Sequence, residues 1–400
     1  MEGLDTSFSM NCKEKVEKLE EKVMTMLIDY EKGGSSTLQL LELIDDIERM
    51  GLGYRFQTNI TKVLSKVASK DYEPKKEEED NLHVACLKFR LLRQHGFSVS
   101  QGLASKLSFS RDRLMECFFW SVGMIFEPQY YSCRVGLTKV GTLITTIDDI
   151  YDVYGSMDEL KIFTDAVKRW DINAMEHLSE VLQVGFLALY NTINQMGYDI
   201  LVAQGKNIVP ILAKAWGELI EAFFVEAKWN HSDYMPTLED YLDNAWQSVS
   251  GVLVLTHGYL LMNQDSNKDV TESSMEKFGD LFKWSSMIFR LYNDLATSSD
   301  EMDRGKSINA ISCYMHEHDV CEEVAREYIK TLIDKAWRRM IEARVACSDD
   351  SKDPFIDMAI NLARISHCTY QFGDGHGAPD ARSRDRVLSV IFEPITEKEH

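Results

Sequence analysis

The sequence has few prolines, fewer basic than acidic residues, and no long apolar run. Lys and Arg number 44 against 64 Asp and Glu, so the formal net charge is -20. Proteins that bind nucleic acid or anionic lipid need a basic surface for the phosphates, so the charge argues against both partners. No stretch approaches the roughly 20 apolar residues that cross a bilayer, which argues against insertion into a membrane.

The cysteines and the first residues lack the patterns of an exported protein. The 8 cysteines form no C-x-x-C pair, which favours scattered thiols over a zinc site or a disulfide framework. The opening MEGLDTSFSMNCKEK has neither the apolar core of a secretory signal nor the acid-poor character of a transit peptide. We therefore expect neither kind of leader in this chain.

The low proline content and the hydrophobic pattern both favour helices. Only 7 prolines occur, and apolar residues recur three and four apart along residues 16–30 and 137–151. Strand-like alternation is not sustained in the sequence, so we predict an all-α protein. The charged stretch 70–80 and the glycine-rich stretch 373–380 predict loops. An acidic pair, Asp45–Asp46, predicts a solvated helix face.

The sharpest acidic motif is IDDIYD, which contains Asp148, Asp149 and Asp152. Positions 148 and 152 are four apart and would stack on one helical face. Like charges at that spacing destabilise a helix unless something positive lies between them. Alone, the motif is equally consistent with an exposed acidic helix end.

A second polar motif, NDLATSSDE, places Asn293, Thr297 and Glu301 on one helical stripe. Amide, hydroxyl and carboxylate oxygens suit Mg²⁺, which keeps several waters and is completed by phosphates of a substrate. Alone, this motif is better explained as a Ser/Thr-rich helix end.

Arginines precede both the acidic motif and the polar motif in the sequence. Arg111 and Arg113 precede the first, and Arg290 stands three residues before Asn293. Because guanidinium groups bind phosphate oxygens in pairs, the combination predicts a site for a polyanion held through metal ions.

In order and spacing, these motifs resemble those of the class I terpene synthases of plants. The resemblance rests on RDRLMECFFWSVG, IDDIYDVYG, FRLYNDLATSSDE and YQFGDGHG, and extends from about residue 13 to the end of the chain. The last of these segments is more similar to the monoterpene branch of the family. The resemblance implies a helical barrel that binds three Mg²⁺ ions, or Mn²⁺, between two facing motifs.

The resemblance also implies roles for individual residues. On one wall of the barrel, Asp148 and Asp152 would bind metal, with Asp149 in support. On the other wall the implied metal ligands are Asn293, Thr297 and Glu301. The implied contacts of the substrate diphosphate are Arg111, Asp148, Asp152, Arg290 and Asn293.

Further implied roles concern the chemistry after ionisation. Arg111, Arg113 and Arg290 would neutralise the departing diphosphate. Trp120 and Tyr370 would stabilise a carbocation from an aromatic floor, although plain core packing explains Tyr370 equally well. Asp374 belongs to the segment that matches the family's lid loop, where Phe372 replaces a histidine often found in relatives.

The chain departs from the family near Gln101. Residues 1–101 match the first half of the family's N-terminal helical domain, and residues 102–400 match the metal-binding catalytic domain without its first helices. We therefore expect a partial N-terminal domain, an internal deletion, and a barrel that has lost buried contacts.

The predicted activity is a Mg²⁺-dependent lyase that ionises a prenyl diphosphate, most simply geranyl diphosphate, to a carbocation that gives a monoterpene. The alternatives are a sesquiterpene synthase acting on farnesyl diphosphate and a truncated inactive relative. A chain-elongating prenyltransferase would show a second DDxxD motif, which this sequence lacks. We expect a monomer, located in the plastid by resemblance or in the cytoplasm if no leader is present.

Overall fold

The protein divides into two compact units, residues Met1–Ser105 and Lys106–His400, each described here by itself. The structure is a computed structural model. It describes residues 15–16, 18–28, 37–50, 52–68, 91–92, 107, 109–232, 234–263, 272–303, 308–347 and 353–391. The predicted boundary at Gln101 and the predicted loop at 70–80 lie outside these residues.

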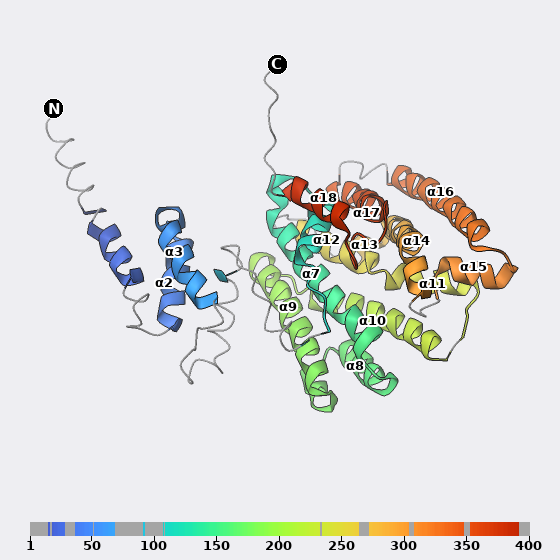
Figure 1. Ribbon diagram of the computed structural model, residues 1–400, viewed down its shortest axis with the longest axis horizontal. Helices are drawn as coiled ribbons and strands as arrows, with labels where there is room; N and C mark the ends of the chain where they lie inside the picture. Colours follow the sequence, from blue (N-terminus) through green and yellow to red (C-terminus); the bar gives the residue numbers. More distant parts are fainter. Residues whose placement is uncertain are drawn as a thin grey trace, which may run out of the picture. The chain divides into compact units, whose positions relative to one another are not determined.

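The first unit contains two amphipathic helices that bury one face each. They are α2 (Thr37–Arg49) and α3 (Gly53–Ala68). The two helices lie side by side in Figure 1. Leu41, Ile44, Ile60 and Leu64 are fully buried, so a small apolar core joins the pair. The prediction of a solvated face at Asp45–Asp46 is wrong for Asp45, whose side chain is buried, whereas Asp46 is exposed.

The second unit is built from helices of very different lengths. They are α6 (Leu114–Met124), α7 (Tyr131–Asp149), α8 (Met157–Arg169), α9 (Glu180–Gln204), α10 (Val209–Ser232), α11 (Leu238–Ser248), α12 (Gly251–Met262), α13 (Glu272–Glu276), α14 (Gly279–Asp303), α15 (Ala310–His318), α16 (Glu322–Ala346), α17 (Pro354–Tyr370) and α18 (Ala381–Ile391). Shorter turns are the 3₁₀ segments η1 (Pro128–Tyr130) and η3 (Ile172–His177) and the π segment η2 (Ile150–Tyr154). No strand occurs among the described residues, which confirms the all-α prediction.

One apolar core holds the second unit together. Helix α14 packs against α16 and α17, α8 against α10, and α6 against α7 (Figure 1). The stripe predicted along 137–151 faces this core, with Leu137, Val140 and Ile147 buried. Helix α12 is apolar on nearly every side and lies inside the unit, as expected of a helix without a polar face. Across the described chain, no helix is both long and apolar enough to cross a membrane.

Two local departures from α geometry shape the polar end of this unit. Helix α7 ends in the π segment η2, and Gly155 closes it by donating its N–H to the carbonyl of Ile150. Ser250 has φ 71° between α11 and α12, which costs energy for a residue with a side chain. Strained backbone and π turns are common near functional sites. The loop predicted at 373–380 is confirmed, because it joins α17 to α18.

Candidate functional site

The predicted site residues gather around a cavity of about 310 Å³ in the second unit. The cavity lies among α7, η2, α10, α14 and the α17–α18 loop. The sequence-predicted residues that line it are Arg111, Asp148, Asp152, Arg290, Asn293, Thr297, Tyr370 and Asp374. The two polar motifs, about 150 residues apart in the sequence, therefore open onto the same space.

Arg111 is tied to the first acidic motif by three hydrogen bonds. Its backbone N–H and its Nε donate to the two oxygens of Asp149, at 2.8 and 2.7 Å, and its Nη2 donates to Asp148 at 2.8 Å. Asp149 is buried and does not line the cavity, whereas Asp148 does. Asp149 therefore acts here as the anchor of Arg111.

The carboxyl groups of the motif repel one another. Burial and the nearby charge of Asp152 raise the pKa of Asp148 to about 7, although Arg111 opposes the shift. Burial also raises the pKa of Asp149. Such a group needs a further positive charge to ionise fully at neutral pH. A divalent cation would supply that charge.

The π segment changes where Asp152 is directed. Asp148 is the penultimate residue of α7, and Asp152 lies within η2. In an α-helix the two would stack, but a π turn alters that register. Both carboxylates still line the 310 Å³ cavity, while Asp152 also lines a neighbouring one.

The facing wall is provided by α14. Asn293 and Thr297 line the cavity, and the Thr297 hydroxyl donates to the Asn293 carbonyl at 3.1 Å. Glu301 belongs to α14, but its side chain lies outside the described residues. Arg290 is also on this wall, three residues before Asn293, and is largely buried.

Arg113 takes a different position from the other two arginines. Its Nη2 donates to the carbonyl of Gly377 at 2.7 Å. It does not line the described cavity. The structure thus places Arg113 against the α17–α18 loop, whereas Arg111 and Arg290 border the cavity itself.

An apolar recess of about 70 Å³ continues from the polar cavity. Trp120, Phe289 and Tyr370 line it. The Trp120 ring lies 4.8 Å from the Phe289 ring and 6.0 Å from the Tyr370 ring. Aromatic faces attract cations, so this recess can stabilise positive charge beside the polar motifs.

The α17–α18 loop covers the junction of cavity and recess. Asp374 Oδ1 accepts from the backbone N–H groups of His376 at 3.1 Å and Gly377 at 2.7 Å. His376 Nε2 lies 3.3 Å from the Thr145 hydroxyl, and burial lowers the pKa of His376 to about 4. The imidazole is therefore neutral at physiological pH. Phe372 points elsewhere, because its exposed ring lies under the guanidinium of Arg382 at 4.5 Å.

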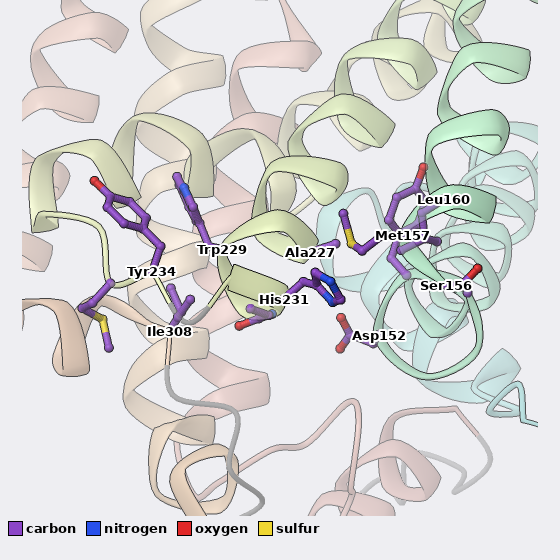
Figure 2. Close-up of a pocket in the computed structure, with 13 residues that line it drawn as sticks. Asp152, Ser156, Met157, Leu160, Ala227, Trp229, His231, Tyr234 and Ile308 are labelled. Atoms are coloured by element: carbon purple, nitrogen blue, oxygen red, sulfur yellow. The ribbon is translucent and has the colours of Figure 1, made fainter.

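A second cavity, of about 530 Å³, borders the first (Figure 2). The two share Asp152, Asn230 and Ile308. Figure 2 shows His231 and Asp152 on one side of this second cavity and Trp229 and Tyr234 on another. Its lining comes from η2, the start of α8, the end of α10, and the segments that follow α10 and precede α15.

Several residues at the site carried no signal in the sequence. Tyr241 and Glu226 both contact Arg290, from α11 and α10. Phe289 forms part of the recess. A single buried tyrosine, glutamate or phenylalanine matches no motif, and only the packing of α11 on α14 and the ion pair from α10 reveal these contacts.

The donor set fits Mg²⁺ better than a metal that demands a closed protein cage. Among the described side chains, no three of His, Cys, Asp or Glu form a cluster able to hold a metal. The cavity instead offers separated carboxylate, amide and hydroxyl oxygens. Mg²⁺ typically uses one or two carboxylates and completes its shell with water and phosphate.

Comparisons with known proteins agree with this picture. The family model described as "Terpene synthase family, metal binding domain" matches residues 100–339, and "Terpene synthase, N-terminal domain" matches residues 3–125. An (E)-beta-ocimene synthase, chloroplastic, from Matricaria chamomilla var. recutita is 50% identical over 534 aligned positions, covering 100% of this chain and 89% of that protein. Tricyclene synthase TPS4, chloroplastic, from Medicago truncatula is 54% identical, covering 74% of this chain and 50% of that protein.

The fold is also similar to a solved structure. Isoprene synthase from grey poplar leaves (Populus x canescens), in complex with three Mg²⁺ ions and dimethylallyl-S-thiolodiphosphate, has a TM-score of 0.67 and 36% identity. The match covers 96% of this chain and 97% of that one.

Proposed function

Because the chain belongs to the terpene synthase family, we propose that it is a Mg²⁺-dependent lyase that converts geranyl diphosphate to a monoterpene and diphosphate. The observation that carries the proposal is the meeting of two oxygen-rich motifs, from α7–η2 and α14, at one cavity with an aromatic recess behind it. Arg111 and Arg290 border the same cavity. This arrangement pairs a site for an anionic leaving group with a site for the cation it leaves behind.

The metal ions would be held by Asp148 and Asp152 on one side and by Asn293, Thr297 and Glu301 on the other. When bound, Mg²⁺ supplies positive charge that stabilises the diphosphate as the carbon–oxygen bond breaks. The isoprene synthase structure with three Mg²⁺ ions supports this assignment by similarity.

Arg111 is placed to exchange partners when metal and substrate bind. Asp149 accepts hydrogen bonds from the backbone N–H and Nε of Arg111, while Nη2 of Arg111 donates to Asp148. With Asp148 engaged as a metal ligand, Nη2 would be free to turn to a diphosphate oxygen, while Asp149 would keep its hydrogen bonds to the backbone N–H and Nε of Arg111. Arg290 would bind the diphosphate from the opposite wall, and Arg113 would act on the covering loop.

The recess would receive the hydrocarbon part of the substrate. Trp120 and Tyr370 present aromatic surface to it, and the Trp120 ring also lies at right angles to the His376 ring. The faces of these rings attract a cation, and their apolar surface offers no hydrogen bonds to water. The loop carrying Asp374 would keep solvent out until the cation loses a proton or is captured.

Geranyl diphosphate is favoured over farnesyl diphosphate as substrate. The relatives named for ocimene and tricyclene, both monoterpenes, are 50% and 54% identical to this chain. A sesquiterpene synthase acting on farnesyl diphosphate remains the second candidate.

We also propose the domain organisation 1–101 and 102–400, with a segment missing between them. The alignment with the ocimene synthase spans 534 positions although this chain has 400 residues. The two family models overlap at residues 100–125, near the proposed junction. The two relatives are named as chloroplastic proteins, which supports a plastid location for this chain. We also propose that the chain is a monomer.

The test is incubation of the purified chain with geranyl or farnesyl diphosphate and Mg²⁺, followed by mass spectrometry of the volatile products. We expect a monoterpene from geranyl diphosphate, and none when a chelator removes the metal. Folded protein that yields no hydrocarbon or alcohol from either substrate would show instead that the chain is an inactive relative.

A further inference from the structure

The hydroxyl of Tyr241 joins α11 to the wall formed by α14. It accepts hydrogen bonds from Arg290 Nε at 2.7 Å and from Arg290 Nη2 at 2.5 Å, and it donates to Asp294 Oδ2 at 2.8 Å. A phenol has one O–H and two lone pairs, so these three bonds use its full capacity. Tyr241 is 1% exposed, and water cannot take over these bonds.

Asp294 completes the grip on Arg290. Its Oδ1 lies 2.9 Å from Arg290 Nε, and its Oδ2 accepts from the backbone N–H of Ala310 at 2.9 Å. Asp294 is 1% exposed and does not line the cavity, unlike its neighbour Asn293. Within the second motif, Asn293 thus lies on the cavity side and Asp294 supports the arginine.

A weaker contact from α10 restrains the same guanidinium. Glu226 Oε1 lies 3.6 Å from Arg290 Nη2 and accepts from the Ser248 hydroxyl at 2.6 Å. Among the described residues, these contacts of Arg290 fall on Nε and Nη2. Because Arg290 also lines the cavity, Nη1 is the nitrogen of this group best placed to meet an anion there.

The protonation state of Tyr241 suits this arrangement. Burial raises the pKa of Tyr241 well above its usual value of 10, even though Arg290 opposes the shift. The phenol therefore keeps its proton, which it needs in order to donate to Asp294. A charged phenolate would instead repel Asp294 and compete with an incoming diphosphate for the arginine.

We propose that Tyr241 is a positioning residue for diphosphate binding, which holds the Arg290 guanidinium with one edge toward the cavity. The inference deepens the proposed function and rests on it, since a diphosphate in the cavity is what Arg290 would bind. The alternative is that Tyr241 serves only as a packed aromatic ring, whose centroid lies 6.5 Å from that of Trp229. Phenylalanine keeps the ring and removes the hydroxyl, so it separates the two roles.

The first experiment measures binding of inorganic diphosphate in the presence of Mg²⁺ by calorimetry. For Tyr241→Phe we expect a Kd raised about tenfold or more, because the variant loses the hydrogen bonds that hold a charged guanidinium in place. The matched control is Tyr259→Phe. Tyr259 is also buried, but its hydroxyl contacts Ser274 at 3.4 Å and neither residue lines the cavity, so the Kd of this variant should stay at the wild-type value.

The second experiment repeats the change in an Arg290→Lys background. If Tyr241 acts through Arg290, Tyr241→Phe should raise the Kd of the Arg290→Lys variant less than about twofold. The effects of two substitutions do not add when one residue acts through the other. Equal losses in both backgrounds would overturn the positioning role, as would a wild-type Kd for Tyr241→Phe. Should Tyr241→Phe fail to fold, Asp294→Asn tests the same grip with the ring intact.

Binding and turnover separate the two proposals. Wild-type protein that binds Mg²⁺ and diphosphate but forms no terpene contradicts the proposed function and leaves the role of Tyr241 measurable. Wild-type protein that binds no diphosphate contradicts both. With active protein, Tyr241→Phe should raise KM for geranyl diphosphate and lower kcat, while its Tm stays within a few degrees of wild type.

Discussion

Asp148 is proposed both as a metal ligand and as a partner of Arg111. It lines the cavity and accepts a hydrogen bond from Arg111 Nη2. We expect Asp148→Ala to lower turnover by at least about 100-fold, because loss of a metal ligand costs more than the 10- to 100-fold typical of supporting residues. Asp46→Ala is the control, since Asp46 belongs to the exposed side of a similar acidic pair in α2. Unchanged turnover in Asp148→Ala would remove this residue from the proposed ligands.

The burial of His257 leads to a prediction about stability that does not depend on the site. The Trp216 Nε1–H donates to His257 Nε2 at 3.3 Å, and His257 Nδ1 lies 2.9 Å from the Leu253 carbonyl oxygen. Burial lowers the pKa of His257 to about 4. An unfolded histidine titrates near 6.5, so between pH 6.5 and 4 the unfolded chain binds the extra proton. Stability should therefore be complete above pH 6.5 and fall as the pH drops toward 4.

The size of this effect can be measured by urea unfolding at pH 7 and pH 4.5. A histidine whose pKa falls from about 6.5 to about 4 on folding changes the free energy of unfolding by about 3 kcal/mol. His257→Gln keeps an acceptor for Trp216 and removes the titration, so its loss of stability between the two pH values should be smaller by about 2–3 kcal/mol. Equal losses in both proteins would mean that His257 does not titrate in this way.

At the scale of elements, the α17–α18 loop depends on glycine. A Cβ on Gly375 would lie 2.3 Å from the carbonyl oxygen of Thr369 in the backbone of α17. Gly375→Ala must therefore displace the loop from α17, and with it the turn closed by Asp374. We expect turnover to fall about 10-fold or more, because small displacements of groups around a bound substrate slow catalysis strongly. A Cβ on Gly279, at the start of α14, meets nothing within 4 Å. Gly279→Ala is thus the control and should keep wild-type turnover.

The same scale shows what the sequence could and could not predict. Residues 137–151 have regular apolar spacing, and they form a helix with that face buried. The sequence does not reveal the π turn at Ile150–Tyr154, because a segment of five residues is too short to show a periodicity of its own. The contacts of Tyr241 were missed for another reason: they join α11 to α14, and single-residue chemistry carries no signal of which helices meet.

At the scale of the whole molecule, the two units have separate apolar cores. The predicted site residues all belong to the second unit, between Arg111 and Asp374. The core of the first unit is small, and its described part centres on α2 and α3. Small cores give marginal stability, so the first unit should unfold at a lower temperature than the second.

Leu64→Ala tests whether the first unit contributes to activity. Leu64 is fully buried in α3, and loss of a buried leucine costs about 2–5 kcal/mol, a large share of the stability of so small a unit. In scanning calorimetry we expect the lower transition to shift down or disappear while the upper one stays in place. Turnover of geranyl diphosphate should then remain close to wild type, because no residue of the cavity is touched. If the upper transition and turnover both fell with the lower one, the units would be energetically coupled, and the first unit would be required to hold the catalytic cavity in shape.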